Sequence, residues 1–205
     1  RAEIAAREHD LGLQFRATVA LFNRISEFQT PQALAPQLSR LRQITTQKGD
    51  LIALAGMQLA LAKLEACRGN CGSANIHLET GRAFLARHPQ PVSTGAVRLV
   101  DASLAILAGN LSRSMSSARA CYDEAAIQGN KVLMAGGAGL LGLLKLILGD
   151  ASKSKEYLAQ ALEVSEEVLY VRLGVLDNLA QVALYEGDFD QCGKFIEECG
   201  KVIAA

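Results

Sequence analysis

The chain has 205 residues and carries 21 Lys and Arg against 21 Asp and Glu, so its formal net charge at pH 7 is zero. Half of the residues are hydrophobic, only 5% are aromatic, and Pro is scarce, which is typical of packed helices. A neutral chain with so few aromatic residues lacks the basic, aromatic surface of a nucleic-acid-binding protein, so we expect no direct contact with nucleic acid.

The N-terminal part predicts two helices. Apolar side chains recur at intervals of three and four residues within residues 2–26, which predicts the first helix. The first ten residues are polar, and we interpret them as the end of a linker helix from a preceding domain. The pair Thr30-Pro31 marks the next helix start, with Thr as N-cap and Pro in the first turn. The second helix is expected to run to about Gln47.

The rest of the chain is divided by a recurring dipeptide, Gly followed by Asp or Asn. Gly adopts the left-handed conformation that ends a helix, and the Asx side chain caps the helix that follows. Because most of these pairs lie about 20 residues apart, they predict helical hairpins of about 40 residues. The pairs are residues 49–50, 69–70, 109–110, 129–130, 149–150 and 187–188. The expected hairpins are about 11–48, 50–88, 92–128, 130–168 and 169–203.

After each turn glycine between paired helices, a small, a larger and a small residue recur in the second helix. Such a series lets two helices approach closely while the larger side chain fills the gap. The third hairpin fits this series only if its turn is about four residues longer, through Arg113. The series are Ala74, Leu78, Gly81; Ala118, Tyr122, Ala125; Ser154, Leu158, Ala161; and Cys192, Ile196, Cys199.

The first helices carry a matching pair, as in Leu61-Ala62, Leu141-Gly142 and Leu179-Ala180. Together with the turn glycine and the series in the second helix, this pattern resembles the tetratricopeptide repeat. The period of about 40 residues is similar to the long variant found in maltose-type bacterial transcription activators. The resemblance implies an all-α fold, an α-solenoid or right-handed superhelix of about five hairpins in residues 11–205.

In such a solenoid the first helix of each hairpin lines the concave side, where a partner would bind. Counted back from each turn glycine, the inward positions are polar at both ends of the groove and apolar in the middle. That pattern suits an amphipathic or extended peptide with an apolar centre. The expected groove residues are Arg16, Asn23, Lys63, Leu99, Ser103, Leu140, Leu143, Asp177, Asn178, Gln181 and Tyr185.

Other signals are explained by helix packing. The glycine-rich run at residues 136–142 lies inside a helical segment, whereas a phosphate loop would need its glycines in a turn after a strand. The apolar segment Val132–Leu148 is short for a membrane span and contains Lys145, so it is either buried or partly offered to a partner. Cys67 and Cys71 lack a second pair that would complete a zinc site. We expect no metal, no cofactor and no catalytic residues.

The sequence therefore predicts a non-catalytic scaffold for protein–protein interaction, with free thiols in the cytoplasm. It is interpreted as a fragment of a larger bacterial signalling or transcription-regulatory protein. Its partner would be a protein or peptide in the groove or a second copy of the chain, with no membrane contact. The alternative is a small-molecule-sensing regulatory domain with an apolar pocket. Residues 155–205 carry four Lys and Arg against ten Asp and Glu, so this end is a solvated acidic surface, one side of a head-to-tail contact between ends, or an acidic docking end.

Overall fold

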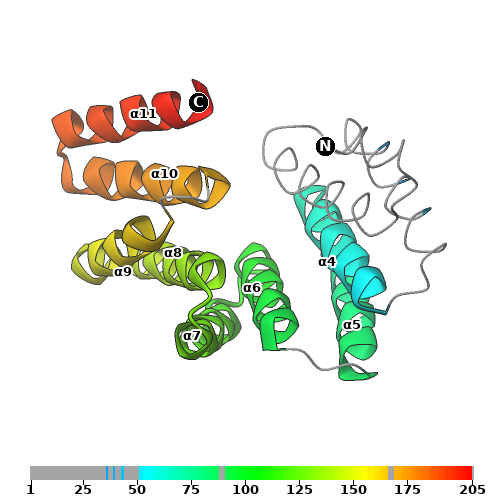
Figure 1. Cartoon of the computed structure of the whole chain (residues 1–205). Coiled ribbons are helices and arrows are strands. Elements are labelled where there is room, and N and C mark those ends of the chain that lie inside the picture. The colour runs from blue at the N-terminus through cyan, green and yellow to red at the C-terminus, as the bar shows by residue number, and fades with distance from the viewer. Residues whose placement is uncertain are drawn as a thin grey trace. The chain divides into compact units, whose positions relative to one another are not determined.

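The computed structural model describes residues 51–87, 91–165 and 169–204, together with the isolated positions 36, 39 and 43. Every regular element in the three ranges is an α-helix, and the helices follow one another as antiparallel hairpins (Figure 1). The predicted fold class, an all-α solenoid of helical hairpins, is confirmed. The hairpin expected at 11–48, with Arg16 and Asn23, lies outside the described residues apart from the three isolated positions.

The chain divides into two compact units, residues 1–100 and 101–205. The first contains the hairpin of α4 and α5 and the start of α6. The second contains the end of α6 and the helices α7 to α11, in which α8 packs against α7, α9 and α10, and α10 packs against α11. The helices are α4 (Leu51–Cys67), α5 (Cys71–Arg87), α6 (Pro91–Leu107), α7 (Leu111–Gln128), α8 (Lys131–Ile147), α9 (Ala151–Val164), α10 (Leu169–Glu186) and α11 (Phe189–Ala204).

The turns between helices form as the Gly-Asx pairs predict. All five described turn glycines have a positive φ of 65–79°, the region in which a side chain would be strained. At four of these turns the following Asn or Asp accepts a hydrogen bond from the backbone N–H three residues on, as Asn130 does from Leu133 at 3.2 Å and Asp188 does from Gln191 at 3.0 Å. At the turn after Gly69, the Asn70 side chain donates to Glu65 instead. These turns leave almost no loop, so consecutive helices must pack side by side. The glycines are Gly69, Gly109, Gly129, Gly149 and Gly187.

The prediction of a longer third turn, through Arg113, is wrong. Asn110 is the N-cap of α7 and its side chain accepts from the Arg113 N–H, so α7 begins at Leu111 as in the other hairpins. Ser114 then takes the first small position, where it is fully buried and donates its hydroxyl to the Ala102 carbonyl at 2.8 Å. The series that follows this turn is therefore Ser114, Ala118 and Cys121, not Ala118, Tyr122 and Ala125.

An equivalent serine-to-carbonyl hydrogen bond recurs one hairpin later. It fixes which residues of the two helices in each hairpin lie opposite each other. Ser154 of α9 donates to the Gly142 carbonyl of α8 at 2.8 Å, again across twelve residues. A Cβ at Gly142 would lie 2.6 Å from Leu158 Cγ, and one at Gly137 would lie 3.0 Å from the backbone nitrogen of Tyr122. Gly137 and Gly142 thus serve close helix packing, as the sequence indicated, and the glycines of α8 lie within a helix instead of a phosphate loop.

Helix α8 lies at the centre of the second unit, because it contributes to two apolar clusters. One cluster joins it to α6 and α7, and the other joins it to α9 and α10. The side chain of Tyr122 packs against both. The buried members are Ala102, Ala118, Leu141 and Leu144 in the first cluster, and Ala138, Leu158, Ala161, Val175, Leu179 and Val182 in the second. Within the three described ranges, no helix is long and apolar enough to cross a membrane.

In the first unit, the end of α4 is tied to the turn by Glu65. Its carboxylate accepts from Asn70 Nδ2 at 2.9 Å and from Arg68 at 2.8 Å, while its carbonyl accepts from the Asn70 N–H at 2.8 Å. The hydrogen bond from Asn70, followed by the bond and charge of Arg68, lowers the pKa of Glu65 below its ordinary value of 4.5, against the opposing effect of partial burial.

A lowered pKa makes the contribution of Glu65 to stability dependent on pH. The ionised carboxylate stabilises the folded state above the ordinary pKa, and this stabilisation is lost as the pH falls through the lowered folded value. We expect Glu65→Gln to be less stable than the wild type in urea at pH 7 and nearly as stable near pH 3. The exposed pair of Glu79 and Arg82 offers the control, since Glu79→Gln should have little effect at either pH. A Glu65→Gln deficit that persists unchanged at low pH would contradict this account.

Candidate partner-binding surface

One face of α8 remains half exposed although most of the helix is buried. Gly136, Leu140 and Leu143 are partly exposed, and Val132 and Ile147 at the two ends are 37% and 49% exposed. These residues recur at intervals of three and four, so they form one stripe along the helix. The stripe contains no polar side chain. It can therefore bury apolar groups of a partner without leaving a polar group of α8 unpaired.

The neighbouring helix α10 carries polar side chains at the positions of the repeat that leucines occupy on α8. Asn178 and Gln181 stand nine and six residues before Gly187, as Leu140 and Leu143 stand before Gly149. Asn178 is partly exposed and Gln181 is exposed. Since α8 and α10 pack against each other, these four residues belong to one surface, which we call the first-helix face. It offers leucines on one helix and amide groups on the next.

Two further predicted residues border the first-helix face on α10. Asp177 accepts a hydrogen bond from Gln181 Nε2 at 2.8 Å, which orients the Gln181 amide. Tyr185 is 63% exposed, and its hydroxyl lies beside the turn at Gly149, 3.8 Å from the position of a Cβ there. Tyr185 therefore extends the face toward the turn between α8 and α9, with an apolar ring and a polar tip.

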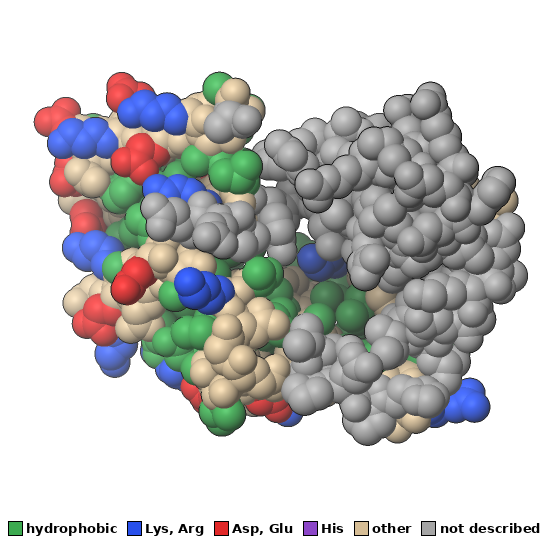
Figure 2. Space-filling view, in the orientation of Figure 1, with side chains coloured by type: hydrophobic (Ala, Val, Ile, Leu, Met, Phe, Trp, Pro, Cys, Tyr) green, Lys and Arg blue, Asp and Glu red, His purple; other side chains and the backbone are tan. Residues whose placement is uncertain are grey.

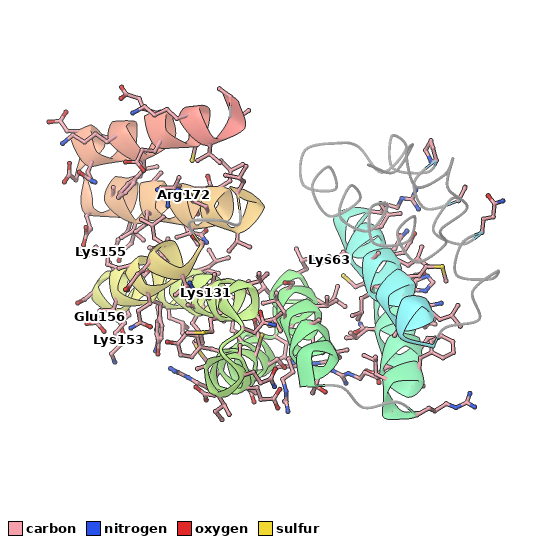
Figure 3. The ribbon with its side chains drawn as sticks, viewed as in Figure 1. Lys63, Lys131, Lys153, Lys155, Glu156 and Arg172 are labelled. Atoms are coloured by element: carbon pink, nitrogen blue, oxygen red, sulfur yellow. The ribbon has the colours of Figure 1, made fainter. Side chains whose placement is uncertain are left out.

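Ion pairs join α10 to α9 and α11 next to this surface. Lys155 of α9 donates to both carboxylate oxygens of Glu186, at 2.7 and 3.0 Å, and Arg172 lies 3.9 Å from Glu198 of α11. Figure 3 labels Lys155 and Arg172. Cys199 of α11 is partly buried. Burial, followed by the charges of Asp177 and Glu198, raises the pKa of its thiol, so it stays protonated at neutral pH.

The remaining predicted residues divide between the two units. Ser103 lies on α6 in the second unit, at the position that corresponds to Leu143 and Gln181, and is partly buried. On another side of α6, the buried carboxylate of Asp101 accepts from Ser117 Oγ at 2.5 Å and pairs with Arg113 of α7. Lys63 and Leu99 are partly buried residues of the first unit. The structure thus brings Leu140, Leu143, Asp177, Asn178, Gln181 and Tyr185 together on two adjacent helices.

Sequence reasoning missed exposed apolar residues at both edges. Leu107 at the end of α6 is 59% exposed and Ile147 completes the α8 stripe. Both lie one turn beyond a predicted residue, so the helical period could have identified them. On the face seen in Figure 2, hydrophobic side chains show between charged ones over these helices. In the described ranges, no three His, Cys, Asp or Glu side chains are grouped so that they could hold a metal ion.

Comparison with known proteins supports the fold alone. No family model matches the chain, and no curated protein matches it by sequence. Among solved structures, it is similar to BtubC (BKLC) from P. vanneervenii, with 16% identity, a TM-score of 0.60, and coverage of 95% of this chain and 91% of the other. It is also similar to the TPR-like repeats of a putative kinesin light chain from Podosopora anserina. Two crystal structures of those repeats each have 16% identity to this chain, and each match covers 93% of this chain and 95% of the other. Their TM-scores are 0.56 and 0.55.

These likenesses define the fold as a TPR-like array of helical hairpins. The first-helix face is the surface of this fold whose composition we consider next. Its groups are leucines, amides, one carboxylate and one phenol. They can bury apolar side chains and hydrogen-bond to the backbone of a bound segment.

Proposed function

We propose that this chain is a protein-interaction scaffold that binds an apolar peptide segment or helix on the first-helix face. The observation that carries the proposal is the half-exposed leucine stripe on α8 beside exposed amide groups on α10. An apolar stripe on a helix that is otherwise packed exposes surface that a partner can bury. The amides of Asn178 and Gln181 would fix the orientation of the bound segment by hydrogen bonds to its backbone.

The proposed ligand has an apolar centre and polar ends. Leu140 and Leu143 would contact the apolar centre, and Asp177 would favour a basic residue next to it. A peptide that lies across α8 and α10 would therefore carry two or three apolar side chains followed by Lys or Arg. This composition is the expected result of a selection from random peptides.

The test is selection of a phage-displayed library of random peptides against the chain, followed by fluorescence anisotropy with the enriched peptides. We expect Leu143→Glu to weaken binding by about tenfold or more, because a carboxylate would lie unpaired where the peptide is apolar. Leu143 is partly exposed, so the variant should keep its helical circular dichroism. Ile127 is 88% exposed and lies on α7, which contributes no residue to the face, so Ile127→Glu is the matched control. Peptides that bind Leu143→Glu as tightly as the wild type would overturn the proposal.

We infer further that the scaffold belongs to a larger cytoplasmic signalling or transcription-regulatory protein of a bacterium, in which binding biases an output domain. The support is the hairpin length of about 40 residues, which is similar to that of the maltose-type activators. The gene tests this inference: an output domain is expected in the same reading frame. A frame that encodes the repeats alone would contradict it.

A further inference from the structure

The first-helix face ends in a row of exposed apolar side chains at the turns. Leu107, Ile147 and Tyr185 each stand two residues before a turn glycine, on α6, α8 and α10. They are 59%, 49% and 63% exposed. We call these three residues the turn row. Because they occupy the same position of the repeat on successive first helices, they lie on one side of the second unit.

Packing between the helices makes the turn row continuous. Residues of α6 and α8 share one apolar cluster, against which Ile106 packs, and α8 packs against α10. The Tyr185 hydroxyl lies 3.8 Å from the position of a Cβ at Gly149, only two residues after Ile147. A ligand that contacts all three residues of the turn row must therefore run across the helices.

Polar groups of α10 lie next to the turn row. Gln181 is exposed one helical turn before Tyr185, and it donates one amide N–H to Asp177, which leaves a second N–H for a ligand. Asn178 is partly exposed, and its side chain forms no hydrogen bond within the described ranges. These amides can pair with backbone groups of a bound segment if that segment has backbone groups to offer.

The spacing of the turn row limits the conformation of such a segment. Packed helices lie about 8–10 Å apart, so the apolar side chains recur at about this distance. A β-strand presents a side chain to one face at every second residue, about 6.8 Å apart. A polyproline II segment presents one at every third residue, about 9.3 Å apart. An α-helix does so at every seventh residue, about 10.5 Å apart. The row therefore fits a polyproline II segment or a helix, but not a strand.

The amides of α10 favour the polyproline II segment over the helix. The backbone groups in the middle of a helix pair with one another, so a bound helix would leave the amides of Asn178 and Gln181 with side chains alone. A polyproline II segment has no internal hydrogen bonds, and its carbonyl groups can accept from both amides. Exposed aromatic rings such as that of Tyr185 also line surfaces that bind polyproline II segments.

The α10 end of the turn row is acidic. Asp188 and Asp190 are exposed beside Tyr185 in the sequence, and neither forms an ion pair with a described residue. Glu186 is already paired with Lys155. A Lys or Arg at this end of the ligand would complement the two carboxylates, and its cation could also lie over the Tyr185 ring.

We propose that the ligand of the first-helix face is a polyproline II segment with an apolar residue at every third position and a basic residue at the end that lies over α10. This inference rests on the proposed function and adds the conformation, spacing and orientation of the ligand. Three apolar side chains of the segment contact Leu107, Ile147 and Tyr185 in turn. Asn178 and Gln181 donate hydrogen bonds to its carbonyl groups.

Fluorescence anisotropy with three synthetic peptides tests the conformation and the spacing. The first peptide has three Leu-Pro-Pro repeats followed by Arg-Arg. The second has the same composition with its three leucines adjacent, and the third is an alanine-based helix with leucine at every seventh position and the same Arg-Arg end. We expect the first to bind at least about tenfold more tightly than either of the others. Equal binding of the first and second peptides, or tighter binding of the helix, would overturn the proposal.

A shorter peptide tests the orientation. Two Leu-Pro-Pro repeats followed by Arg-Arg should reach only α8 and α10, because the basic end is fixed at α10. Leu107→Glu should therefore weaken the three-repeat peptide about tenfold and leave the two-repeat peptide unchanged, whereas Tyr185→Ala should weaken both. Ile127→Glu is the control and should change neither. If Leu107→Glu weakens both peptides equally or neither of them, the proposed orientation is wrong.

Leu143→Glu separates this inference from the proposed function. If that change weakens the peptides selected from the random library, but the two Leu-Pro peptides of equal composition bind alike, the first-helix face is the binding site and the polyproline II inference is wrong. If it weakens none of the selected peptides, the proposed function fails and this inference fails with it.

Discussion

Leu158→Ala is expected to lower the free energy of unfolding by about 2–5 kcal/mol, which makes it one of the two most damaging changes considered for the second unit. Leu158 is fully buried on α9 and contacts α8 at Gly142, while its cluster includes Val175 and Leu179 of α10. Removing its side chain would leave a cavity where three helices meet. The glycine opposite has no side chain that could move in to fill it, so little relaxation is expected.

Urea unfolding followed by circular dichroism measures this loss. Ile127→Ala removes an equally large side chain from the solvent-exposed face of α7, and should change the stability by less than about 0.5 kcal/mol. If both variants lost the same stability, burial at α9 would not be what makes Leu158 important.

Most of the fold could be predicted from the sequence because its turns are specified locally. A glycine with positive φ and an Asx side chain that caps the next helix act within six residues of chain. They fix the turn at Gly149 that follows the end of α8, and the start of α9 after Asp150, whatever packs around them. For the same reason Leu140, Leu143, Asn178 and Gln181 could be assigned to one face by counting back from the turns.

The third hairpin was misread because its second helix satisfies the small-residue pattern in two registers. Ser114, Ala118, Cys121, Tyr122 and Ala125 leave two series that fit almost equally well. The choice is made by contacts between helices, above all the hydrogen bond from Ser114 to the Ala102 carbonyl. Serine can occupy a fully buried position only when its hydroxyl finds a partner, and that partner lies twelve residues away.

The exposure of Ile196 could not be predicted for a related reason. The sequence placed Ile196 in the gap between two helices, and that prediction is wrong, because Ile196 is 60% exposed on α11. Ile196 occupies the same place in the repeat as Leu158, and both are apolar. Burial of such a residue depends on which helix lies over it, and this is a property of the whole array. The sequence does contain a usable signal, since Gly193 and Gly200 replace larger residues found at these positions in the other hairpins. These larger residues are Asn75, Met115 and Lys155, and Arg82, Tyr122 and Leu162.

Gly142→Ala is the second change with a large expected effect. We expect it to lower the free energy of unfolding, although helix propensity alone would raise it. Alanine is favoured over glycine in a helix by about 1 kcal/mol. At this site, however, the new Cβ would lie 2.6 and 2.8 Å from Leu158 Cγ and Cδ2, and 3.2 Å from the Ser154 carbonyl. Overpacking of this kind costs about 1–3 kcal/mol, so we expect a net loss of stability. Gly174→Ala on α10 meets no neighbour within 4 Å and should gain stability, which makes it the control.

The two changes in the core should also depend on each other. In a Leu158→Ala background the carbon atoms that obstruct a Cβ at Gly142 are gone, and the cavity can accept the methyl group. Gly142→Ala should therefore be neutral or stabilising there, with a coupling energy of about 1–3 kcal/mol in the double-mutant cycle. Additive losses would mean that the Ser154 carbonyl, not Leu158, sets the limit at this position. In either result, the space between α8 and α9 at Gly142 determines how closely this hairpin can pack.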